Sequence, residues 1–171
     1  MLPTNKYAIW DLADDLSEII KPLYPATGEH NVLHPMRMMA MVPEFCSNYA
    51  LPASDFLLAS AFHDTGRIND DEDELHGARS ATIMHQHTHA SMLAQLLVRE
   101  HCKNNLPLGQ STDHLRYIMF FKDLDAIDRQ RFGAHEQITL LMTNSDRAHW
   151  MQVNRILQKC QSWQEMIQEM C

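Results

Sequence analysis

A histidine and an aspartate stand side by side at His63-Asp64, directly after an apolar run that begins at Phe56. Neighbouring residues on a helix point about 100° apart, so both side chains of this pair can reach one cation beside the ridge between them. His34 lies upstream of the pair and Asp125 downstream. Two imidazoles and two carboxylates suit divalent Mn, Fe, Co, Ni or Zn. Such a cation lowers the pKa of bound water and screens charge on phosphorus, although eleven histidines make chance groupings common.

The apolar run is the element that must position the pair. It predicts a helix from Ser54 to about Thr65, with Ser54 or Asp55 as the N-cap. Gly66 stands where this helix would end in a left-handed C-cap. We therefore expect the His-Asp pair on the last helical turn, at the rim of the core.

The rest of the chain shows helical periodicity as well, and only five glycines and few β-branched runs argue against sheet. Proline is acceptable in a first turn, so a second helix should begin near Leu33 or His34, and Pro43 should kink or interrupt it. Ser111 should cap a late helix that Gly133 closes. Helical patterns cover residues 7–20, 33–49, 78–102, 111–129, 136–142 and 145–170. The sequence predicts one all-α domain over residues 1–171, without repeats or linkers.

Charge and composition exclude several classes of partner. The formal net charge of −8 argues against a nucleic-acid polymer or an anionic membrane as ligand, while a small phosphate ester needs only a local cationic pocket. No apolar stretch approaches the length of a membrane span, and the first residues lack the pattern of a signal peptide. The four cysteines have no close spacing, so we expect reduced thiols and a cytoplasmic location.

Four segments follow one another along the chain: His34-Pro35-Met36-Arg37-Met38, Ala59 to Arg67, His76-Gly77-Ala78-Arg79-Ser80-Ala81 and Lys122-Asp123-Leu124-Asp125-Ala126-Ile127-Asp128. In this order they resemble the HD-domain superfamily of metal-dependent phosphohydrolases. His63-Asp64-Thr65-Gly66-Arg67 is similar to the segment with the His-Asp pair after which the family is named. The family's first segment carries a His and an Arg three residues apart, as His34 and Arg37 are here. The resemblance covers roughly residues 28–133.

The resemblance implies a bundle of five or more helices around a central metal, with residues 134–171 as a helical extension. It implies hydrolysis of a phosphate mono- or diester, in a nucleotide or another small phosphorylated metabolite. His34, His63, Asp64 and Asp125 would hold the metal (Mn, Fe, Co, Ni or Zn, with Mg also open), and Asp123 competes with Asp125. Asp64 could also accept a proton from the attacking water.

Further roles follow from the same resemblance. Arg67 would contact the phosphate and contribute to catalysis, and His76 would donate a proton to the leaving group or bind a second ion. With His101 in range, a second metal stays open. Thr65-Gly66-Arg67 stands where two branches of the family carry acidic residues, so we assign the chain to neither. The cations expected to meet phosphate are Arg37, Arg67, Lys122 and Arg129.

Other interpretations remain at this stage. The chain could be a non-catalytic HD domain that binds a nucleotide or a protein partner. Asp125 could be a solvated acid facing Arg129, and His30 is interpreted as a supporting or surface residue rather than a ligand. His85 and His89 stand four apart and could grip a metal, but a polar helix face accounts for them better. The amphipathic segment 145–170 could pair with a second copy, which would give a homo-oligomer.

Overall fold

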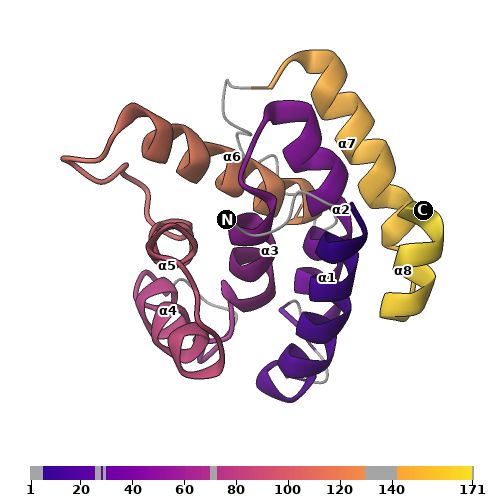
Figure 1. Ribbon diagram of the computed structural model, residues 1–171, viewed down its shortest axis with the longest axis horizontal. Helices are drawn as coiled ribbons and strands as arrows, with labels where there is room; N and C mark the ends of the chain where they lie inside the picture. The colour runs from indigo at the N-terminus through magenta and orange to yellow at the C-terminus, as the bar shows by residue number, and fades with distance from the viewer. Residues whose placement is uncertain (1–5, 26–27, 29, 70–72, 130–141, 171) are drawn as a thin grey trace.

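The computed structural model describes residues 6–25, 28, 30–69, 73–129 and 142–170, and every regular element in these ranges is helical (Figure 1). This confirms the prediction of an all-α chain. A short 3-10 helix, η1 (Lys21–Leu23), follows the first helix. The α-helices are α1 (Lys6–Ile20), α2 (Leu33–Tyr49), α3 (Ala53–Phe62), α4 (His76–His87), α5 (Met92–Glu100), α6 (Thr112–Arg129), α7 (Asn144–Leu157) and α8 (Trp163–Met170).

Helix α3 lies at the centre of the packing and contacts α1, α2, α4 and α5. Figure 1 shows α4 and α5 on one side of α3, and α7 and α8 on the other side, beyond α2. The apolar run predicted to be buried forms this centre: Phe56 and Phe62 are fully buried, and Phe56 meets Phe121 of α6 edge to face at 5.8 Å between ring centroids. The end of α3 is therefore held deep in the protein rather than at its rim.

The turn after α3 differs from the prediction. Helix α3 ends at Phe62, so His63 and Asp64 lie in the turn that follows it. Gly66 is not a left-handed cap, because the described glycines with positive φ are Gly28 and Gly109. Close packing requires Gly66 instead: an added Cβ would lie 2.5 Å from the Ser80 backbone nitrogen and 2.7 Å from the His76 carbonyl oxygen. The turn with the His-Asp pair thus packs directly onto the first turns of α4.

The single long helix predicted over residues 78–102 is wrong. The chain forms α4 and α5 separately, because Thr88 is extended and Ser91 starts α5 by accepting a hydrogen bond from the Ala94 nitrogen at 3.0 Å. In one continuous helix His76 and His101 would be about 37 Å apart, at 1.5 Å per residue. The break lets α5 pack against α4 and brings these two histidines into contact.

The other helices agree with the sequence predictions in part. Helix α2 begins at Leu33 as predicted and passes Pro43 without interruption. The hydroxyl of Ser111 caps α6 by accepting from the His114 nitrogen at 3.2 Å. Helix α4 ends at His87, so the His85 and His89 pair does not share a helix. The pattern over 145–170 is two helices, α7 and α8, and the predictions for Gly133 and most of 136–142 lie outside the described residues.

Among the described residues, no helix combines the length and the apolar character that crossing a membrane requires.

Candidate metal centre

The first cluster is built on two buried imidazoles. His34 lies in the first turn of α2, and His63 directly follows α3. Both side chains are fully buried, and their Nε2 atoms face each other at 3.0 Å. The close packing of α2 against α3 brings the two rings together, with 4.9 Å between their centroids.

The other ring nitrogen of each histidine already has an acceptor. His63 Nδ1 lies 3.0 Å from the Ser60 carbonyl oxygen, and a carbonyl can only accept, so this nitrogen carries a proton. His34 Nδ1 lies 2.6 Å from Asp128 Oδ2 and donates to it. In the neutral rings both Nε2 atoms therefore present lone pairs to one another. Metal-ligating histidines almost always donate their second N–H in this way, because the bond fixes the ring's orientation and tautomer.

Two carboxylates complete this first cluster. Asp125 Oδ1 lies 3.3 Å from His34 Nε2 and 3.9 Å from His63 Nε2. This oxygen is buried and has no partner in hydrogen-bonding geometry among the described residues. Asp64 Oδ2 lies 3.4 Å from His63 Nε2 and 3.7 Å from His34 Nε2. The structure thus gathers all four residues predicted as ligands, and Asp125 rather than Asp123 faces the imidazoles.

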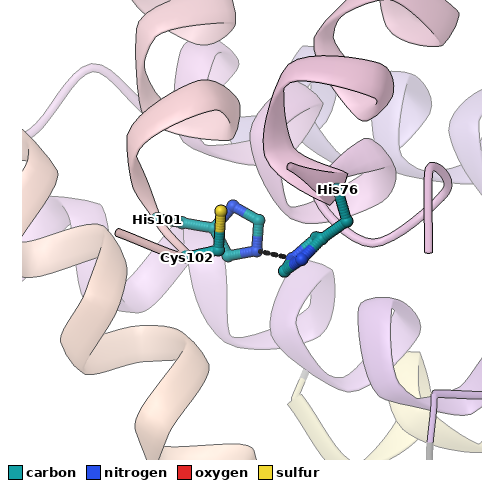
Figure 2. A group of neighbouring side chains, drawn as sticks. All are labelled: His76, His101 and Cys102. Carbon is teal, nitrogen blue, oxygen red and sulfur yellow. Dashed lines mark hydrogen bonds between the residues drawn. The ribbon is translucent and has the colours of Figure 1, made fainter. Parts of the chain in front are cut away.

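A second cluster lies on the other side of Asp64. Asp64 Oδ1 is 3.0 Å from His76 Nε2 and 3.5 Å from His101 Nε2, and these two nitrogens are 2.9 Å apart. Figure 2 shows the contact between the two rings, one from the start of α4 and the other from just after α5. Again each Nδ1 is committed to a carbonyl oxygen, that of Asp73 for His76 and that of Val98, at 2.7 Å, for His101. The pattern of the first cluster is repeated.

Asp64 therefore lies between two pairs of imidazoles and turns one oxygen to each pair. These buried groups could hold a metal ion. Within each of two sets, all donor atoms lie within 4.8 Å of one another: the first set is His34, His63 and Asp125, and the second is His63, Asp64 and His101. Imidazole nitrogen and carboxylate oxygen suit Mn, Fe, Co, Ni and Zn. The sequence prediction of a second metal drew on His76 and His101, which are the residues found here.

The two carboxylates of the site have lowered pKa values despite their burial. Burial alone would raise the pKa of Asp64, but His63, His101 and His76 hold it well below its usual range. Burial also opposes ionisation of Asp125, yet Arg129 and His34 lower its pKa. Both carboxylates are therefore negative at neutral pH, as metal ligands must be.

The histidines respond in opposite directions. Burial would lower the pKa of His34, but the neighbouring carboxylates of Asp125 and Asp128 raise it above its ordinary value. For His101 burial is the largest influence, and it lowers the pKa to about 4. A neutral His101 presents a lone pair rather than a proton at Nε2, which is the form a cation requires.

Asp128 supports His34 and was not assigned a role from the sequence. It is fully buried and accepts from His34 Nδ1 and from Arg37, whose Nε and Nη2 lie 2.6 and 3.0 Å from its two oxygens. Burial would raise the pKa of Asp128, but His34 and Arg37 lower it to about 2. Arg37, predicted to contact phosphate, is thus buried and holds Asp128. Asp128 stands three residues after Asp125, on the same face of α6, and this spacing was the available signal.

The other predicted cations lie at different places. Arg67 Nε is 3.1 Å from Asp64 Oδ1, and Arg129 Nη2 is 3.1 Å from Asp125 Oδ2. Their side chains are 17% and 31% exposed, so both line an edge of the site that solvent reaches. Lys122 is half-buried and donates to the Lys103 carbonyl oxygen. Of the predicted cations, Arg67 and Arg129 are therefore the two that lie next to Asp64 and Asp125.

Three further residues border the centre. His30 is buried rather than on the surface, and its Nε2 lies 3.8 Å from Asp64 Oδ2. Tyr24 is buried and donates to the Ala61 carbonyl oxygen at 3.0 Å, and burial together with the charge of Asp64 raises its pKa. Cys102 lies beside His76 and His101. Neither Tyr24 nor Cys102 was recognised from the sequence, because no local motif marks them.

Comparison of the chain with protein-family models, with curated proteins and with solved structures gave no match. The function is therefore inferred from the chemistry of the site itself.

Proposed function

We propose that this chain is a metal-dependent phosphohydrolase of the HD-domain type, acting on a small phosphate mono- or diester. One observation carries the proposal. Four buried histidines donate through Nδ1 to fixed acceptors and turn Nε2 inward, in two pairs on either side of Asp64. Two bare nitrogens about 3 Å apart repel each other, so each pair needs a shared proton or a cation, and the carboxylate oxygens beside each pair complete a donor set that suits a cation.

The donor set fits two cations. His34, His63, Asp64 and Asp125 would hold the first, and Oδ1 of Asp125 supplies a buried negative oxygen that has no partner in hydrogen-bonding geometry among the described residues. His76 and His101, with Oδ1 of Asp64, would hold the second. When bound, such cations lower the pKa of a coordinated water and neutralise charge on phosphorus.

The chain's own residues divide the remaining work. Asp64 can serve both cations, and its low pKa fits this role better than that of a proton acceptor. His76 has both ring nitrogens engaged inside the cluster, so we assign it to the second cation rather than to the leaving group. Arg67 and Arg129 lie at the accessible edge, next to the two carboxylates, and are placed to meet phosphate oxygens as well.

The charge pattern supports a small anionic substrate. The chain as a whole carries a net charge of −8, yet two guanidinium groups border the centre. The imidazoles are buried and the two arginines are partly exposed beside the carboxylates, so a phosphate that enters along them would meet two cations. A nucleotide or another small phosphorylated metabolite fits this entry better than a nucleic-acid polymer, which needs an extended basic surface.

Metal analysis and a substrate panel test the proposal together. We expect purified protein to retain Mn, Fe, Co, Ni or Zn after dialysis, and the protein loaded with Mn or Co to hydrolyse at least one member of a panel. The panel contains nucleoside mono-, di- and triphosphates, cyclic dinucleotides and p-nitrophenyl phosphate. His63→Ala and Asp64→Asn should weaken metal retention by at least about tenfold and abolish hydrolysis.

His114→Ala is the matched control, since His114 lies on α6 outside the clusters and bonds to Gln110. It should retain metal and activity. A chain that binds no metal in any form contradicts the proposal outright. Metal binding without hydrolysis of any panel member would contradict the enzymatic part and favour a metal-containing binding domain.

A further inference from the structure

A cysteine borders the second cluster. Donor atoms of His76, His101 and Cys102 lie within 4.8 Å of one another, and Figure 2 shows the Cys102 sulfur beside the His101 ring. Cys102 is half-buried, whereas the other two described cysteines, Cys46 and Cys160, are buried among core residues. Cys102 is thus the one described thiol next to imidazole nitrogens.

The packing of α4 against α5 holds the thiol in this place. Cys102 follows His101 just after α5, and its Sγ donates to the Glu74 carbonyl oxygen at 3.4 Å. Gly77 permits the approach: an added Cβ there would lie 2.7 Å from the Val98 carbonyl oxygen and 3.0 Å from the Cys102 sulfur. The same contact therefore places His76, His101 and Cys102 together.

We propose that Cys102 supplies a thiolate ligand to the second metal position, together with His76, His101 and Asp64. This inference rests on the proposed function in requiring a cation at that position. It adds a difference between the two positions, because the first has only nitrogen and oxygen donors whereas the second has sulfur as well. The second position should therefore select a thiophilic cation such as zinc over magnesium.

The number and kind of donors support this assignment. Two imidazoles, one carboxylate oxygen and one sulfur make four ligands, the number zinc takes at closed protein sites. The thiol's present contact, a 3.4 Å bond to a carbonyl, is weak and easily exchanged. On binding, the S–H bond breaks, its electron pair forms the metal–sulfur bond, and the proton leaves to solvent.

Cobalt spectroscopy tests the proposal without relying on activity. Metal-free protein titrated with Co²⁺ should develop a thiolate-to-cobalt charge-transfer band in the near ultraviolet. Cys102→Ser should lose this band and release zinc from one position at least about tenfold more readily. Cys160→Ser is the matched control, since Cys160 lies near the C-terminal helices, and it should keep both properties.

A second measurement uses the unaltered chain, in case the serine variant folds poorly. Iodoacetamide labelling of Cys102, mapped by mass spectrometry, should fall sharply when one further equivalent of zinc is added. Cobalt that binds without the band, or zinc that leaves the labelling of Cys102 unchanged, overturns the thiolate assignment and leaves the proposed function standing. Protein that binds neither metal contradicts the proposed function as well.

Discussion

Replacing Asp128 by asparagine tests how the first cluster is positioned. The carboxylate accepts from His34 Nδ1 and from two nitrogens of Arg37, at 2.6, 2.6 and 3.0 Å. Asparagine has the same shape but only one acceptor oxygen, and its amide nitrogen is a donor. In Asp128→Asn that nitrogen must face a donor of either Arg37 or His34. The buried guanidinium also loses its counter-charge.

The expected magnitude follows from burial. Asp128 is fully buried and Arg37 is 5% exposed, and breaking a buried pair by removing one charge costs about 3–5 kcal/mol. Loss of the group that orients a metal-ligating histidine typically weakens metal binding about 10–100-fold, or about 1.4–2.7 kcal/mol. Both effects should appear, the first in metal-free protein and the second only on metal titration.

Urea unfolding of the metal-free protein measures the first effect, and competition with a chromophoric chelator measures the second. Asp113→Asn is the control: Asp113 is exposed on the first turn of the same helix, and its replacement should cost less than about 1 kcal/mol and leave metal binding unchanged. In Arg37→Met/Asp128→Asn the asparagine oxygen is free to accept from His34. The double variant should therefore recover much of both losses.

Two outcomes would contradict these roles of Asp128. If Asp128→Asn unfolds within about 1 kcal/mol of the unaltered chain and binds metal equally well, Asp128 neither compensates Arg37 nor orients His34. If stability falls but metal affinity does not, the ion pair is structural and the positioning role of Asp128 is wrong.

Two other perturbations separate packing from metal binding. Gly66→Ala should cost about 1–3 kcal/mol and weaken metal retention, because the new Cβ would meet backbone atoms of Ser80 and His76 and displace the turn that carries Asp64. Thermal unfolding and metal retention check this against Gly109→Ala, where the new Cβ meets nothing within 4 Å and the positive φ adds about 1–2 kcal/mol of backbone strain, so this variant should lose stability but keep its metal. Removal of metal with a chelator should lower Tm by about 5–10 °C if metal was present at about 100 times its Kd, and an unchanged Tm would mean that no cation stabilises the fold.

The sequence predicted well what local patterns determine. The apolar run before His63-Asp64 identified α3, and the start of α2 and the cap of α6 followed from residue types at helix ends. The gathering of His34, His63, Asp64 and Asp125 was also anticipated, since the resemblance supplied an order of segments that spacing alone could not. These predictions required no knowledge of how distant helices pack.

Other features depend on contacts between helices, and the sequence does not display them. The break between α4 and α5 was missed because helical periodicity continues through it, while the cap at Ser91 resembles many serines inside helices. The close approach at Gly66 was mistaken for a left-handed cap, since both need a glycine and only the neighbours distinguish them. Cys102 lacks a spaced partner cysteine and acquires neighbours only when α5 returns to α4.

The electrostatics of the site support the proposed function independently of the sequence resemblance. Asp64 and Asp125 are buried, and burial alone disfavours their charged forms, yet both have lowered pKa values. Arg129 pairs with Oδ2 of Asp125, whose other oxygen faces His34 and His63. Arg67 pairs with Oδ1 of Asp64, the oxygen that also faces His76 and His101. A fold selected for stability alone would replace such groups by apolar side chains, often without loss. The proposed function accounts for their presence, through cations bound between the imidazoles and the carboxylates and an anionic substrate beside the arginines.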